Sequence, residues 1–483
     1  GYLVGEFRRN MRSFPLQRLN ASRVCIAFTV HTIVSVVLAV KLYKSYNEVA
    51  PASLEPSGAS ATNTIAFSRH HLNVLCPETP SKQVLRETVP HVAECKAEHM
   101  IAGTQLAQYE LWRHQNPETC DGKKFLVALV ETGESSGARK MKGRGRGIGS
   151  LIQIAAVNLL LAKRNDRILV FDSKHDTNWA SAPMCSSSNM FLCHFLPITN
   201  CTVSQEDIDS AGDFPPRELW GHGPCSNYGK CATGAARVLR TTKNFGFRYQ
   251  DMFNLPDVGP LYAAELRAMD CAYVAREKQI YWAVMQAMAY LTRLQDTTRA
   301  AIRSLQADAF DNRTLAPQTV SIHMRFGDKS REGSLQSEQR YITLANSISA
   351  NYSAYFVSTE DQLALDRVRD QLTRPVWFVR GKRLAREERE TALTELARQG
   401  DASGMFVDAW LNLLLAIQCD AYIGTLSSTW NRMLDALRST VGCKAQAKYY
   451  DPTPRRKFSE RLPHTWHQGG EFFWSKGAHV FED

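Results

Sequence analysis

The stretch Thr319–Lys329 (TVSIHMRFGDK) constrains the fold of this chain more than any other. Apolar and polar residues alternate along its first part, a period of two that indicates a β-strand. The Gly-Asp pair that follows predicts a turn, so Arg325, Asp328 and Lys329 lie together at the carboxyl end of the strand. Ligands of open α/β sheets bind at that end, and both basic side chains suit phosphate oxygens. The alternative interpretation is a charged turn that is exposed to solvent and binds nothing. Motifs elsewhere in the chain bear on the choice between a binding site and such a turn.

Short apolar runs alternate with helical patterns in both halves of the chain. In the second half we expect strands at 354–358, 376–379 and 421–424 and helices at 387–398, 406–417 and 430–437. In the first half we expect strands at 125–130 and 167–172, a helix between them at 151–162, a loop-like region at 181–260 and helices within 261–308. The predicted fold class is therefore α/β with parallel sheets.

A glycine-rich loop, Gly143–Ser150 (GRGRGIGS), precedes the helix expected at 151–162. Gly145 and Gly147 let the backbone approach a ligand closely, and a helix N-terminus favours anions. The loop matches neither the dinucleotide fingerprint nor the P-loop, because no Gly-Lys-Ser/Thr follows. Donor binding by Gly145 and Gly147 is one interpretation, and a plain flexible turn is another.

An uncharged run of 17 residues, Val24–Val40, predicts a membrane anchor when it is extended to 24–43. Five arginines precede this run and only two lysines follow closely, so the positive-inside rule places the N-terminus in the cytosol. A cleaved signal peptide is the alternative, but the run is long and no small-residue cleavage site follows it directly. We expect a single-pass type II membrane protein of the Golgi, with residues 44–75 as a Ser-, Ala- and Pro-rich stem.

The cysteines agree with a lumenal location. Of the 12 cysteines, Cys25 lies in the predicted anchor, and the 11 others are scattered without a C-x-x-C pair. This pattern predicts disulfide bonds rather than a zinc site. Three glycosylation sequons begin at Asn200, Asn312 and Asn351 and indicate a glycoprotein of the secretory pathway.

Three motifs of the second half resemble the donor site of a known enzyme family. They are H-M-R-F-G-D-K at 323–329, V-S-T-E-D at 357–361, and C-D-A-Y-I-G-T-L-S-S-T-W at 419–430. They are similar to motifs of the inverting fucosyltransferases typified by the core alpha-1,6-fucosyltransferase and the nodulation-factor fucosyltransferase. The resemblance covers about 319–438 well and 125–172 thinly. It implies a GT-B-like fold, in which two Rossmann-like domains face each other across a cleft, with GDP-fucose as donor, no cofactor and no metal.

The resemblance also implies roles for individual residues. His323 would contact the nucleoside end, Arg325 would bind the diphosphate and Lys329 would assist the phosphate or acceptor side. Asp361 would hold the guanine or a neighbouring side chain. Ser427 and Ser428 would cap the phosphates, and Glu360 and Thr429 are further candidates for donor binding.

The chain departs from the family pattern at several positions. Phe326 stands where the core enzyme has a second arginine, Thr429 where it has a glutamine, and Asn412 where it has an aspartate. Glu332 lies one position out of register with the proposed acceptor-side carboxylate, and no SH3-like domain is evident after residue 440. The donor is therefore predicted more firmly than the acceptor.

The chemistry of the residues fits sugar transfer independently of the resemblance. Departure of a nucleoside diphosphate builds negative charge, and Arg325 and Lys329 would stabilise that charge. A carboxylate near the acceptor hydroxyl can act as general base, with Glu332 as first candidate and Asp328 as second.

The sequence thus predicts a fucosyltransferase with a glycan or glycoprotein acceptor. The expected segments are a cytosolic tail (1–23), the anchor (24–43), the stem (44–75), an N-terminal domain with a cysteine-rich insertion (76–315), a donor-binding domain (316–450) and a C-terminal extension (451–483). A transferase that uses another nucleotide sugar and an inactive lumenal glycan-binding protein are the alternatives. The net charge of +10 also fits nucleic acid, but no aromatic-interleaved basic patch supports that partner.

Overall fold

The computed structural model describes most of the chain beyond the predicted stem. The described residues are 79–128, 147–214, 236–241, 279–311, 313–326, 336–381, 383, 400–425, 428–453 and 478–480. The predicted tail, anchor and stem lie outside these ranges. Within them, no helix is both long enough and apolar enough to cross a bilayer.

The first half of the chain forms a four-stranded parallel sheet and helices around it. Its strands are β1 (Lys124–Ala128), β2 (Arg167–Phe171), β3 (Gly212–Asp213) and β4 (Val238–Arg240), in the order β2-β1-β4-β3. Its helices are α3 (Lys82–Thr88), α4 (Pro90–Ala93), η2 (Ala97–His99), α5 (Thr104–Gln115), α6 (Ile148–Arg164), α7 (Met190–Cys193), α8 (Gln205–Asp209), α13 (Gln279–Leu291) and α14 (Asp296–Phe310).

The second half forms a six-stranded parallel sheet. Its strands are β5 (Thr319–Met324), β6 (Ala354–Thr359), β7 (Val376–Trp377), β8 (Ala421–Gly424), β9 (Lys448–Asp451) and β10 (Ala478–Val480). Its helices are α15 (Glu338–Ile348), η6 (Ser349–Asn351), α16 (Gln362–Gln371), α18 (Ala402–Gln418) and α19 (Thr429–Thr440). The strand order is β10-β9-β8-β5-β6-β7, which is the order of a doubly wound nucleotide-binding sheet.

The predicted α/β class with parallel sheets is confirmed, and most predicted strands appear close to their expected bounds. Buried apolar runs gave the strongest signal, because strands covered on both faces are apolar throughout. The strand expected at 376–379 is shorter, since β7 ends at Trp377. Parts of other predictions, including the helix at 387–398 and residues 129–130, lie outside the described residues.

Residues 181–260 contain more regular structure than the loop-like composition predicted. β4 lies within this region and pairs in parallel with β1, and α7 and α8 precede it. A three-residue strand is too short for its periodicity to register in a sequence pattern. The predicted C-terminal extension contributes β10 to the edge of the second sheet.

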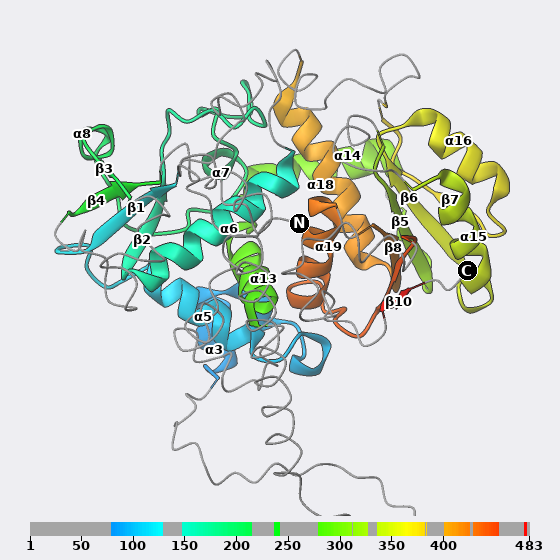
Figure 1. Cartoon of the computed structure of the whole chain (residues 1–483), viewed down its shortest axis with the longest axis horizontal. Helices are drawn as coiled ribbons and strands as arrows, with labels where there is room; N and C mark the ends of the chain where they lie inside the picture. Colours follow the sequence, from blue (N-terminus) through cyan, green and yellow to red (C-terminus); the bar gives the residue numbers. More distant parts are fainter. Residues whose placement is uncertain are drawn as a thin grey trace, which may run out of the picture. The chain divides into compact units, whose positions relative to one another are not determined.

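Helices α6, α13, α18 and α19 lie between the two sheets (Figure 1). Their apolar faces form one continuous core that draws side chains from both halves of the chain. Trp282 of α13 and Trp410 of α18 are among its largest fully buried members. Burying such side chains supplies ~1.5–3 kcal/mol each, so they contribute to the core.

Disulfide bonds tie distant segments together. Cys95 pairs with Cys443, Cys120 with Cys201 and Cys185 with Cys193, while Cys419 is buried and free. The first bond joins segments 348 residues apart and fixes the end of α19 to the N-terminal helices. Six of the cysteines predicted to form disulfide bonds are therefore paired, Cys419 is not, and the other four lie outside the described ranges: Cys76, Cys225, Cys231 and Cys271.

Candidate functional site

The candidate site lies where the carboxyl ends of β5, β6 and β8 meet. The chain adds β6 and β7 on one side of β5 and then returns to add β8 on the other side. The winding direction therefore reverses between β5 and β8, and ligands of open α/β sheets bind at such a switch point. His323 lies there, in register with Ser358 on β6 and Gly424 on β8.

Arg325 and Glu360 form an ion pair directly beyond these strand ends. The Arg325 guanidinium contacts Glu360 Oε1, and the Phe326 N–H donates to the same oxygen at 2.9 Å. Arg325 keeps 21% of its side chain exposed, whereas Glu360 keeps 10%. Glu360 thus orients Arg325 and fixes the Phe326 backbone directly after β5, while part of the Arg325 side chain stays exposed.

His323 is buried and neutral at the end of β5. Burial, with a smaller contribution from the Arg325 charge, lowers the pKa of His323 to about 3. Its ring centroid lies 6.1 Å from that of Trp430. His323 Nδ1 and Asn431 Oδ1 are buried without a hydrogen-bond partner among the described residues. Buried polar atoms of this kind indicate a missing partner such as a ligand or water.

The N-termini of α6 and α19 meet beside His323. A Cβ atom on Gly149 would lie 3.0 Å from the Trp430 backbone nitrogen, so the two first turns touch through their backbones. One turn further along α6, Arg432 Nη2 donates to Gln153 Oε1 at 3.3 Å, so the two helices also touch through side chains. Both positive helix ends therefore converge on one place.

Neither helix neutralises its own N-terminus. The N-cap residues Gly147 and Ser428 form no side-chain cap, and the first turn of each helix contains no acidic residue. A helix N-terminus carries about half a positive charge, and its first amides lack acceptors. Two such ends together are unfavourable unless an anion lies between them, so this point suits a phosphate or diphosphate.

The structure brings together several of the residues predicted from the sequence. His323, Arg325, Glu360, Ser428, Thr429 and Gly147 all lie at the strand ends or at the two helix N-termini. Asp361 is 1% exposed, and its Oδ1 accepts the Ala364 N–H as the N-cap of α16. The other predicted site residues, Gly145, Asp328, Lys329, Glu332 and Ser427, lie outside the described residues.

Sequence reasoning missed a second basic residue near the end of β6. Arg383 Nε donates to the Thr359 carbonyl at 3.3 Å, and Arg383 Nη2 donates to the Val379 carbonyl at 2.6 Å. Burial raises the pKa of Asp408 on α18, and the nearby Arg383 opposes that shift. Asp408 interrupts the strongly apolar pattern of the helix expected at 406–417. This interruption is the one sequence signal that could have indicated it.

Cys185, Cys193 and His194 bring three metal-ligating atoms within 4.8 Å of one another. The disulfide bond occupies both sulfur atoms. His194 Nε2 donates to the Trp179 carbonyl at 2.9 Å, and its ring stacks on Phe406 at 3.8 Å. In the oxidised chain this cluster is therefore a structural contact rather than a metal site.

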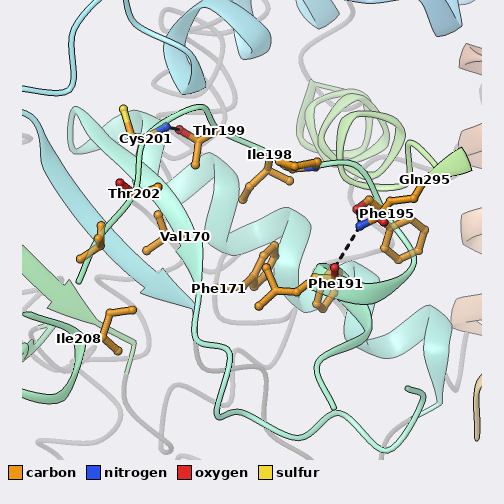
Figure 2. Close-up of a pocket in the computed structure, with 13 residues that line it drawn as sticks. Val170, Phe171, Phe191, Phe195, Ile198, Thr199, Cys201, Thr202, Ile208 and Gln295 are labelled. Carbon is orange, nitrogen blue, oxygen red and sulfur yellow. Dashed lines mark hydrogen bonds between the residues drawn. The ribbon is translucent and has the colours of Figure 1, made fainter. Parts of the chain in front are cut away.

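A separate apolar pocket of about 260 Å³ opens beyond β2 in the first half (Figure 2). Phe171 and Phe191 stack in it with ring centroids 4.3 Å apart. Gln295 Nε2 already donates to the carbonyls of Leu192 and Phe195 at 3.0 and 2.8 Å. The pocket contains none of the residues predicted for donor binding, and its lining suits an apolar group rather than a phosphate.

We expect Gly149→Val to destabilise the chain by ~1–3 kcal/mol, the range for overpacked positions. The new side chain meets backbone atoms of Thr429 and Trp430, which cannot rotate away as a side chain would. The same displacement should weaken binding of inorganic pyrophosphate, measured by calorimetry alongside urea denaturation. Gly212→Ala is the control, because its Cβ would meet only the Leu239 side chain at 3.5 Å. Equal stability of both variants would show that α6 and α19 do not touch at Gly149.

Comparison with known proteins gives only distant similarities. No protein-family model and no curated protein sequence matches the chain. Among solved structures, fucosyltransferase NodZ from Bradyrhizobium is similar at 14% identity and a TM-score of 0.35, over 65% of this chain and 92% of that one. A mutant of Arabidopsis thaliana FUT1 in complex with GDP is similar at 11% identity and a TM-score of 0.37, over 78% and 80%.

POFUT1 in complex with GDP-fucose is similar at 13% identity and a TM-score of 0.33, over 66% of this chain and 95% of that one. Similarities at these TM-scores carry no argument about this chain. Its function is therefore inferred from its own residues.

Proposed function

We propose that this chain is a glycosyltransferase that transfers fucose from GDP-fucose to a glycan or glycoprotein acceptor. The observation that carries the proposal is the convergence of the α6 and α19 N-termini beside Arg325 and His323. This arrangement suits a diphosphate at the switch point of a doubly wound sheet. The resemblance of the surrounding motifs to inverting fucosyltransferases supplies the identity of the nucleotide and the sugar.

Different residues of the site bind different parts of the donor. Arg325 and the first turns of α6 and α19, including Ser428 and Thr429, bind the diphosphate. His323 contacts the nucleoside end, where its neutral ring can accept a hydrogen bond at Nδ1. Lys329 and Ser427 complete the phosphate contacts that the family motif implies.

The reaction inverts the configuration at the anomeric carbon. The acceptor hydroxyl attacks C1 of fucose from the face opposite the diphosphate, and the C1–O bond breaks with its electron pair passing to the departing GDP. The hydroxyl proton passes to a carboxylate, with Glu332 as first candidate and Asp328 as second. Arg325 stabilises the charge on the departing diphosphate, so this mechanism is metal-independent.

The proposed setting is the Golgi membrane. Residues 24–43 would anchor the chain as a single-pass type II protein, and two Rossmann-like domains would face each other in the lumen as in a GT-B transferase. The disulfide bonds between Cys95 and Cys443 and between Cys120 and Cys201 support an oxidising compartment, because such bonds rarely persist in the cytosol.

A lumenal glycan-binding protein without catalysis is the second candidate, and one observation favours it. Phe326, which stands where the family has a second arginine, is 6% exposed and belongs to the apolar core of the second sheet. The site therefore has one cation fewer at this position than the core enzyme.

The proposal is tested by nucleotide release from the purified full-length chain in detergent. GDP-fucose, GDP-mannose and UDP-sugars are offered with a mixed glycan pool, with and without EDTA. We expect GDP release from GDP-fucose alone, unchanged by EDTA. Release from another donor would replace the assigned sugar, and a requirement for metal would overturn the mechanism. Glycan binding without release from any donor would favour the second candidate.

A further inference from the structure

Two glycosylation sequons lie within the described residues, and both asparagines are exposed. They are Asn200-Cys-Thr and Asn351-Tyr-Ser, whereas Asn312 of the third sequon lies outside. We propose that Asn351 and Asn200 carry N-linked glycans. Each asparagine lies near the edge of its sheet where the strands begin, which is the edge remote from the candidate site. This inference rests on the lumenal location that belongs to the proposed function.

Asn351 lies at the amino-terminal edge of the second sheet. It ends the short η6 turn, and β6 begins three residues later. Ser353 of the sequon donates its backbone N–H to the Gln318 carbonyl at 3.0 Å and its hydroxyl to the Pro317 carbonyl at 2.5 Å. Pro317 and Gln318 directly precede β5, so the sequon lies beside the start of that strand.

The candidate site lies at the other end of the same strands. β5 and β6 pair in register from Thr319 with Ala354 to Met324 with Thr359. Six residues at 3.3 Å each separate the two edges by ~20 Å. A glycan on Asn351 therefore projects from the edge remote from Arg325 and leaves the strand ends open.

Asn200 has a comparable position in the first half. Its Nδ2 atom donates to the Pro117 carbonyl at 3.2 Å, and the next residue, Cys201, is bonded to Cys120. Both partners precede β1, which begins at Lys124. An amide nitrogen has two hydrogens, so one can remain bonded to Pro117 while the sugar replaces the other.

The modification is a group transfer from a lipid-linked oligosaccharide diphosphate, the co-reactant that the secretory pathway supplies. A bond forms between the asparagine Nδ2 atom and C1 of the first sugar, and the C1–O bond to the diphosphate breaks. The lipid diphosphate leaves with the electron pair, and the amide loses one proton. Because the Ser353 hydroxyl is bonded to Pro317 in the folded chain, transfer to Asn351 would precede formation of this turn.

The experiment expresses the full-length chain in mammalian cells with an additional acceptor sequon in a C-terminal tag. The tag reports whether the C-terminal end enters the lumen. Asn351→Gln and Asn200→Gln should each remove one glycan, seen as one step of gel mobility that disappears after amidase treatment. Ser353→Thr and Thr202→Ser should keep the glycans, because both retain the hydroxyl of the sequon. Asn346→Gln is the matched control, since this asparagine of α15 lies outside any sequon.

The tag separates the two ways in which the inference can fail. A modified tag with unmodified Asn351 and Asn200, shown by mass spectrometry of the peptides, would overturn the two sites and leave the location intact. An unmodified tag would show that the C-terminal end does not enter the lumen. This result would overturn the inference, which rests on the lumenal location, and would remove that location from the proposed function as well. A modified tag with the loss of one glycan in each variant is the supporting result.

Discussion

Replacing Arg325 by alanine should lower the rate of GDP release from GDP-fucose by roughly a hundredfold or more. Removal of one preorganised donor to a developing negative charge costs ~3 kcal/mol in the transition state, which corresponds to that factor. Arg325 is suited to this part because Glu360 orients it at the end of β5 while part of its side chain stays exposed. The measurement is the steady-state rate of GDP release at saturating donor and acceptor.

Two further arginine variants make this result specific. Arg367→Ala removes an arginine of α16 that also pairs with a glutamate, Glu338, but lies away from the strand ends. It should keep the parent rate, since exposed ion pairs contribute ~0–1 kcal/mol to stability. Arg325→Lys should recover only part of the activity, because lysine lacks the planar fork of the guanidinium. Parent activity in Arg325→Ala would show that the diphosphate binds elsewhere.

The central strands of the second sheet could be predicted from the sequence because their signals are local. β6 and β8 are short, mainly apolar runs, as expected of strands buried on both faces, whereas β5 alternates apolar and polar residues. Arg325 and Glu360 follow two of these strands directly. Since the carboxyl ends of parallel strands share one edge, the sequence alone could place both residues there.

The contact between α6 and α19 could not be predicted in the same way. Gly149 and Trp430 lie far apart in the chain, and each belongs to an ordinary start of a helix when considered alone. Only packing of the shared core brings the two helix ends together, and no periodicity records such a pairing. The disulfide bond between Cys95 and Cys443 could not be predicted either, because the number of cysteines does not determine which of them pair.

Removing the carboxylate of Asp435 should destabilise the chain by ~3–5 kcal/mol, the cost of leaving a buried charge without its partner. Asp435 and Arg438 of α19 are both fully buried, and Arg438 Nε donates to Asp435 Oδ1 at 2.9 Å. Tyr281 of α13 donates its hydroxyl to the other carboxylate oxygen at 2.8 Å. Asp435→Ala would therefore leave the Arg438 guanidinium without an anion inside the core.

Urea denaturation of the full-length chain measures this loss, and two variants separate charge from packing. Tyr281→Phe removes only a hydrogen bond to the carboxylate and should cost ~1.5–3 kcal/mol. Asp435→Leu combined with Arg438→Met removes both charges and should recover much of the stability lost in Asp435→Ala, because apolar residues can replace a buried ion pair. Similar losses in Asp435→Ala and in the double variant would show that packing volume, not the unpaired charge, determines the effect.

This buried pair also bears on the candidate site, because it lies in α19. The Arg438 guanidinium donates to the carbonyls of Lys444 and Ala447 at 3.0 and 2.9 Å and lies over the rings of Tyr422 and Tyr449. The carboxyl end of α19 is thereby fixed to β8 and β9. Because a helix moves largely as one body, we expect Asp435→Ala to weaken pyrophosphate binding at the distant N-terminus even under conditions where the chain stays folded. Unchanged affinity in the folded variant would show that Gly149 and its neighbours position the α19 N-terminus without help from the buried pair.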